Sequence, residues 1–116
     1  MISEEVVEAY NKRLTMDTSN PKKLTPSQRD AVKQYGSSAE NLMKNRDLAV
    51  FIHHFKFEVA DAMTNIRTHT SDANAERVAL ANQLSGIDNF INTLKSAVYK
   101  KNLMIKTENA DQNANQ

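Results

Sequence analysis

The chain has 116 residues, which is enough for one domain with a modest core. It contains no cysteine, so disulfides, thiolate metal sites and cysteine nucleophiles are excluded. Its net charge of +1, from 15 basic and 14 acidic residues, predicts no strong general attraction to nucleic acid or to an anionic membrane. Only two glycines and two prolines occur, and this shortage of helix breakers predicts an all-α fold.

The first predicted helix covers residues 3–16. Ser3 can cap it, and Glu4 and Glu5 fall in its first turn, where the helix dipole favours negative charge. The turn-forming residues that follow, from Asp17 to Lys23, predict an exposed linker.

The second predicted helix covers residues 26–45. Thr25, Pro26 and Gln28 form a capping-box sequence, with threonine at the cap, proline at the first helical position and glutamine at the third. Gly36 lies near the middle, where glycine costs roughly 1 kcal/mol relative to alanine. We therefore expect either a kink at Gly36 or a division into two shorter helices.

The third and fourth predicted helices cover residues 47–67 and 72–104. Asp47 is a plausible cap for the third helix, and Ser71 or Asp72 for the fourth. Both helices carry an apolar stripe, and a short polar turn joins them, which predicts a C-terminal antiparallel helical hairpin. The third stripe consists of Leu48, Phe51, Ile52, Phe55, Val59, Ala62, Met63 and Ile66, and the fourth of Leu80, Ala81, Leu84, Ile87, Ile91, Leu94 and Val98.

Residues 1–105 are thus expected to form a single helical domain, with the N-terminal helices packed alongside the hairpin. The fourth helix is longer than the third, so its end near Val98 and Leu103 is expected to lack a cover. Residues 106–116 contain no apolar side chain larger than alanine and are rich in Asn, Gln and Asp. Such a segment buries too little to offset its ordering entropy, and it predicts a disordered tail.

The end of the fourth helix is the candidate binding site. Lysines gather there around Tyr99, where the helix dipole favours them and where they could also hold phosphates. A second basic group, Lys22, Lys23, Arg29 and Lys33, could join them if the helices fold back. The predicted partner-binding residues are Lys95, Val98, Tyr99, Lys100, Lys101 and Leu103.

No catalytic, cofactor-binding or metal-binding residue is predicted. His54, Glu58 and Asp61 share one helical face and could contribute to a metal site between helices, but the Glu-x-x-His motif of carboxylate-bridged bundles is absent from the sequence. Glu76 is interpreted as favourable at a helix start, and Arg77 as an arginine that either stays solvated or pairs with Asp72 or Asp61. A contact patch at the hairpin tip is the alternative interpretation of this pair.

The segment from Phe55 to Val98 resembles small helical proteins encoded by tailed bacteriophages. In both, a hydrophobic helix ends in a polar turn containing Thr and Asp, and an Ala-Glu-Arg start opens a long heptad-patterned helix. The residues that carry the resemblance are Phe55, Val59, Ile66, Thr68, Asp72, Ala75, Glu76, Arg77, Leu84, Ile87 and Leu94. The resemblance implies an all-helical hairpin of phage origin and no catalytic residues.

The sequence therefore predicts a non-enzymatic protein–protein interaction module, a phage accessory protein that is virion-associated or binds a host factor. A homodimer would bury the part of the long stripe that remains uncovered. The alternative is a nucleic-acid-associated helical protein that uses the C-terminal lysines. The longest apolar run, Leu48–Ile52, is far shorter than the ~20 residues that span a bilayer, so we expect a cytoplasmic location, in the host cell or the virion.

Overall fold

The computed structural model describes residues 3–11 and 16–114, and this part of the chain is all-helical, as predicted. It contains four α-helices and one short 3-10 helix. The elements are α1 (Glu4–Asn11), η1 (Pro21–Lys23), α2 (Pro26–Lys44), α3 (Arg46–Asn65) and α4 (Ser71–Ala114). The expected extension of the first helix to residue 16 falls on residues 12–15, which lie outside the described part.

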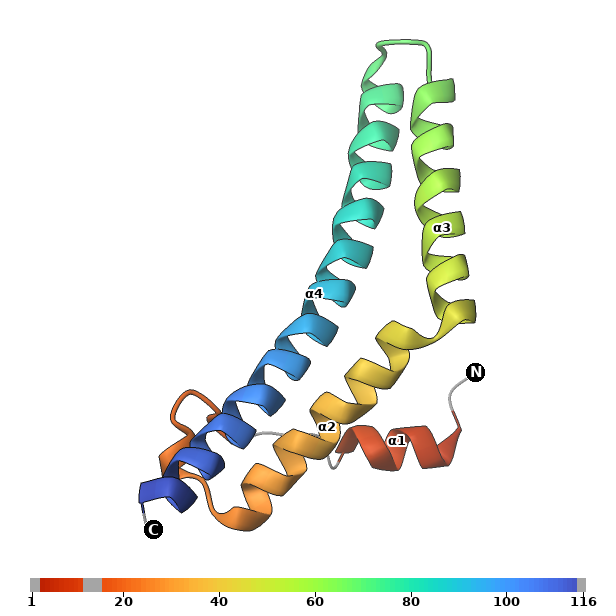
Figure 1. The fold of residues 1–116 in the computed structure, drawn as a ribbon. Coiled ribbons are helices and arrows are strands. Elements are labelled where there is room, and N and C mark those ends of the chain that lie inside the picture. The colour runs from red at the N-terminus through yellow and green to blue at the C-terminus, as the bar shows by residue number, and fades with distance from the viewer. Residues whose placement is uncertain (1–2, 12–15, 115–116) are drawn as a thin grey trace.

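The long helix α4 is the axis of the molecule (Figure 1). α3 runs alongside its first half in the opposite direction, and α2 runs alongside its second half, where the contact with α4 is most extensive. The result is elongated, with extents of 68 × 33 × 28 Å. The radius of gyration is 19.7 Å, whereas a compact domain of this length has about 13 Å.

The capping box at the start of α2 is confirmed. The Thr25 hydroxyl accepts a hydrogen bond from the backbone N–H of Gln28 at 3.1 Å, and the Gln28 side chain accepts one from the backbone N–H of Thr25 at 2.9 Å. From this start α2 continues without interruption through Gly36. The expected kink or division at Gly36 is wrong, because this glycine serves the contact with α4 described below.

A single residue, Asn45, separates α2 from α3. Its backbone is extended, its N–H donates to the carbonyl of Leu42 at 3.1 Å, and its side-chain oxygen accepts from the N–H of Leu48 at 2.9 Å. The same residue thus ends one helix and caps the next. The prediction of Asp47 as the cap is therefore wrong, and Asp47 lies in the first turn of α3 instead.

The fourth helix begins one residue earlier than predicted. The Thr70 hydroxyl accepts a hydrogen bond from the N–H of Ala73 at 3.1 Å, so Thr70 is the cap in place of Ser71 or Asp72. At the other end, α4 continues to Ala114. The predicted disordered tail is wrong for residues 106–114, because Thr107 and Glu108 are half-buried and Glu108 forms ion pairs with α2; residues 115–116 lie outside the described part.

The core is small and lies mainly between α2 and α4. One cluster joins Leu24, Val32 and Met104, and a second joins Ala39, Leu94 and Ala97. In α3 the buried residue is Val59. The half of the molecule that contains α3 therefore has much less interior than the half that contains α2.

Candidate interaction surface

The structure places the predicted partner-binding residues on two sides of α4. Lys95, Tyr99 and Lys100 are exposed, and Tyr99 retains 67% of its accessible surface. Val98, Lys101 and Leu103 are half-buried. The expectation of an uncovered helix end is wrong, because α2 packs along this part of α4.

Gly36 explains how α2 comes so close to α4. A Cβ atom at Gly36 would lie 2.7 Å from the Ala97 carbonyl oxygen and would also collide with the Cβ of Lys101. The absence of a side chain therefore allows the two helix backbones to approach at this point. The cluster of Ala39, Leu94 and Ala97 lies next to this contact.

Ion pairs flank the close contact. Glu40 of α2 receives hydrogen bonds from Lys44, at 3.0 Å, and from Lys101 of α4, at 3.2 Å. The ammonium groups of Lys44 and Lys101 lower the pKa of the Glu40 carboxyl below its ordinary value. One of the predicted partner-binding lysines is thus already engaged within the chain.

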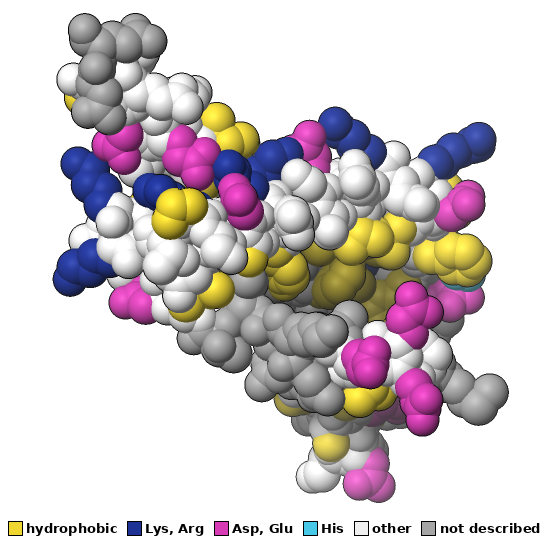
Figure 2. All heavy atoms as spheres, turned by 90° about the horizontal axis from the view of Figure 1, so that it is seen from below, with side chains coloured by type: hydrophobic (Ala, Val, Ile, Leu, Met, Phe, Trp, Pro, Cys, Tyr) yellow, Lys and Arg dark blue, Asp and Glu magenta, His cyan; other side chains and the backbone are white. Residues whose placement is uncertain are grey.

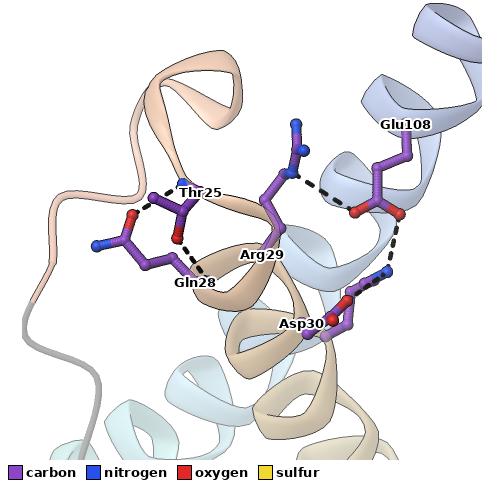
Figure 3. Close-up of polar contacts among 6 residues, drawn as sticks. Thr25, Gln28, Arg29, Asp30 and Glu108 are labelled. Carbon is purple, nitrogen blue, oxygen red and sulfur yellow. Dashed lines mark hydrogen bonds and ion pairs between the residues drawn. The ribbon is translucent and has the colours of Figure 1, made fainter.

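A second group of charges joins the start of α2 to the end of α4 (Figure 3). Lys33 donates to Glu108 at 2.8 Å and lies 3.1 Å from Asp30, and the Arg29 Nε lies 3.6 Å from Glu108. The hydrogen bond to Glu108, followed by that to Asp30, raises the pKa of the Lys33 ammonium above its ordinary value. The fold does bring part of the second basic group to the end of α4, but it places carboxylates among these cations.

On one face of the molecule the basic and acidic side chains are mixed (Figure 2). On the face in Figure 2, Lys and Arg side chains alternate with Asp and Glu instead of forming a continuous patch. The same view shows hydrophobic side chains gathered in a hollow. A nucleic-acid interface typically has its basic side chains clustered on one face.

Arg77 acts beside the turn between α3 and α4, but with partners other than those predicted. Its guanidinium donates to the backbone carbonyls of Ile66, at 3.2 Å, and of Thr68, and also to the Asn74 side chain at 2.6 Å. The carbonyls at a helix C-terminus lack helical partners, and a positive charge there complements the helix dipole. Since α3 has no basic residue in its own last turn, Arg77 of α4 supplies this charge.

The outer face of α3 carries exposed apolar side chains on two flanks of the helix, Val50 and Phe57 on one and Phe51 and Phe55 on the other. Val50, Phe51, Phe55 and Phe57 retain 55%, 70%, 37% and 72% of their accessible surface. Together with Phe90 of α4, at 43%, these exposed side chains include every phenylalanine of the chain. The core between α2 and α4 is built from smaller side chains.

This surface differs from the one that the sequence predicted. Phe51 and Phe55 were expected to face the fourth helix, but that side of α3 consists of Ile52, Val59 and Met63, with Lys56 beside them. Lys56 forms an ion pair with Asp88 of α4 at 3.0 Å. The sequence does indicate an outer apolar face, because Val50 and Phe57 are apolar residues of this helix that lie outside the predicted stripe.

Of the histidines of α3, His54 lies on this outer face and His53 lies at its edge, where it lines a small cleft with Leu42 of α2 and Leu94 of α4. His54 lies 3.1 Å from Glu58 one turn later, and both side chains are well exposed. Within residues 3–11 and 16–114, no group of three or more histidine, aspartate and glutamate side chains is arranged to hold a metal ion. The pair of His54 and Glu58 therefore lacks the third ligand that a metal site would need.

Clefts open at several places on the described surface. One, about 600 Å³, lies between α2 and the Asn-rich side of α4 and includes Tyr35, Asn89 and Asn92. Its lining contains amides and hydroxyls, without a carboxylate or histidine to act as a general acid or base. A small, mostly apolar cleft of about 180 Å³ lies where α2 passes into α3. A wide cleft of about 720 Å³ lies beside the turn between α3 and α4 and includes Asp72 and Glu76.

Comparisons with protein-family models, curated proteins and solved structures gave no match to this chain. Among the helices described, none is both long enough and apolar enough to cross a membrane.

Proposed function

We propose that this chain is a non-enzymatic protein–protein interaction module that presents the outer face of α3 to a protein partner. The observation that supports this most directly is the exposure of Phe51 and Phe57, at 70% and 72%. Burying one such side chain is worth about 1.5–3 kcal/mol. Aromatic side chains are also enriched in the core of protein interfaces.

The exposed part of the predicted site, Lys95, Tyr99 and Lys100, remains a proposed secondary contact. It lies just past the middle of α4, away from the turn between α3 and α4, so a large partner could engage both regions. The resemblance of Phe55–Val98 to small phage proteins supports a role as a phage accessory protein. In that role it would be virion-associated or bound to a host factor in the cytoplasm.

The alternative function is nucleic-acid association through the lysines of α4. Lys101 and Lys33 are engaged by Glu40 and Glu108, which lowers the charge available for phosphates. The exposed Lys95 and Lys100 alone would give weak, salt-sensitive binding.

A pull-down of cell components on the immobilised chain distinguishes between these two functions. We would compare the wild type, a Phe51→Ser/Phe57→Ser variant and a Lys95→Glu/Lys100→Glu variant, with washes in high salt and nuclease. If the proposal is correct, a protein partner will bind to the wild type and to the lysine variant. The same partner will not bind to the phenylalanine variant. Retained material that is released by nuclease and lost with the lysine variant would support the alternative instead.

A further inference from the structure

The outer face of α3 has a regular arrangement along its length. At 3.6 residues per turn, Val50 and Phe57 lie about two turns apart on one face, opposite the buried Val59. His53 and His54 lie between them, with Arg46 toward the start of the helix and Asp61 toward its end. All six of the outer residues are exposed, and in Figure 1 α3 has α4 on one side and no described element on the other.

The surface area indicates how much of the molecule remains to be covered. The chain exposes 9034 Å², roughly 2,600 Å² more than the ~6,400 Å² expected of a compact monomer of 13.1 kDa. Interfaces of obligate dimers bury about 2,000–5,000 Å² in total, or about 1,000–2,500 Å² per chain. The excess, which is spread over the whole elongated molecule, is slightly more than one chain contributes to such an interface, so the uncovered surface is large enough for one.

We propose that the outer face of α3 pairs with α3 of a second copy, antiparallel and around a two-fold axis. This inference rests on the proposed function, because it identifies the partner of the part of that surface around Phe57; Phe51 lies about a third of a turn away around α3. In the register that sets Val50 against Phe57 of the second copy, His53 and His54 lie at the axis. The same register sets Arg46 against Asp61 of the second copy at both ends of the contact.

The charges favour this antiparallel arrangement over a parallel one. A parallel pair in register would place Arg46 beside Arg46 and Asp61 beside Asp61, and like charges in such positions are destabilising. It would also align the two helix dipoles. The antiparallel pair joins opposite charges and opposed dipoles, and it forms a four-helix layer from α3 and α4 of both copies.

Sedimentation equilibrium of the full chain tests the interface. We expect a dimer at micromolar concentration and a dissociation constant at least about 30-fold higher in Phe57→Glu, as for the loss of a hot-spot side chain. Val78→Glu, at an apolar side chain of α4 that retains 60% of its accessible surface, should leave the dimer unchanged. Arg46→Asp and Asp61→Arg should each weaken the dimer, and the double variant should recover it.

Cysteine cross-linking tests the direction of pairing on a chain that has no cysteine of its own. An equimolar mixture of Arg46→Cys and Asp61→Cys chains should form a disulfide-linked heterodimer under mild oxidation, while each variant alone should not. Cross-linking of each variant with itself would overturn the antiparallel arrangement.

A monomer at 100 µM, or a dimer insensitive to both Phe57→Glu and Val50→Glu, would overturn the proposed homodimer. The interaction function would survive that result if a different protein were still retained through Phe51 and Phe57. It would fail as well if the phenylalanine variant retained everything that the wild type retains.

Discussion

Gly36 sets the distance between α2 and α4, because any side chain at this position would collide with the Ala97 carbonyl and with Lys101. Gly86, in the exposed middle of α4, has no atom within 4 Å of the position where a Cβ would lie. The two glycines of the chain thus lie in similar helical backbones but in opposite environments. They form a matched pair for separating helix propensity from packing.

Alanine at these two positions should change stability in opposite directions. Gly36→Ala should lower the free energy of unfolding by about 1–3 kcal/mol, the usual cost of overpacking. Gly86→Ala should raise it by up to about 1 kcal/mol, the gain in helix propensity. Urea unfolding followed by circular dichroism measures both, and a stabilising Gly36→Ala would show that the helices are further apart than described.

Glu40 makes the α2–α4 contact sensitive to acid. Its pKa is lowered in the folded chain from an ordinary value of 4.5 by Lys44 and Lys101. Its contribution to stability is therefore present above pH 4.5 and is lost as the pH falls through the folded-state pKa. The melting temperature should fall more steeply below pH 4.5 in the wild type than in Glu40→Gln. Glu5→Gln, at an exposed residue of α1, should keep the wild-type slope.

Among the elements, α3 is stabilised at both of its ends by residues outside its own sequence. Asn45 caps its start, and Arg77 of α4 supplies the donors at its end. The helix therefore ends where the arginine reaches it, beside Ile66 and Thr68. The pairing of α3 with α4 and the termination of α3 are achieved by the same side chain.

Removing this side chain should loosen the end of α3. Arg77→Ala should cost about 1.5–3 kcal/mol, as expected for hydrogen bonds to a charged group. It should also speed hydrogen exchange at the amides of Met63 and Asn65. Arg67→Ala, at an exposed arginine in the adjoining turn, should stay within about 0.5 kcal/mol of the wild type. Equal effects of the two variants would contradict the capping role of Arg77.

The elements that depend on local chemistry could be predicted from the sequence. The Thr25–Gln28 capping box and the polar turn before Ser71 both mark helix boundaries with short-range hydrogen bonds. Gly36 could not be interpreted in the same way, because its role depends on Ala97 and Lys101, more than 60 residues away along the chain. The tail was mispredicted for a related reason, since Glu108 gains its partners only when α2 lies beside α4.

The exposure of the aromatic residues of α3 was not predicted, because these residues fit two faces of the helix. Phe51 and Phe55 follow the three-and-four spacing that connects Leu48 with Val59, so periodicity alone assigns them to the interior. The structure turns α3 so that Ile52 and Met63 face α4 instead. In α3 apolar side chains occur on more than one face, and its contacts with α4 and with α2 cover only part of them.

At the scale of the whole molecule, the elongated shape follows from the interruption at Asn45. Small-angle scattering of the Phe57→Glu variant, which we expect to be monomeric, should give a radius of gyration near the 19.7 Å of the structure. A value near 13 Å, that of a compact domain, would mean that α3 folds onto α2 in solution. The wild type provides the comparison with the associated state.

The arrangement of α4 against two successive helices also has a consequence for the order of folding. Contacts between α4 and the earlier helices join residues that are progressively further apart along the chain: Arg77 with Ile66 across 11 residues, Asp88 with Lys56 across 32, Lys101 with Glu40 across 61 and Glu108 with Lys33 across 75. Loop-closure entropy favours the shortest of these first, and each contact shortens the loop that the next must close. The chain is thus arranged to close from the Thr68–Thr70 turn outward, with the contact between Glu108 and Lys33 forming last.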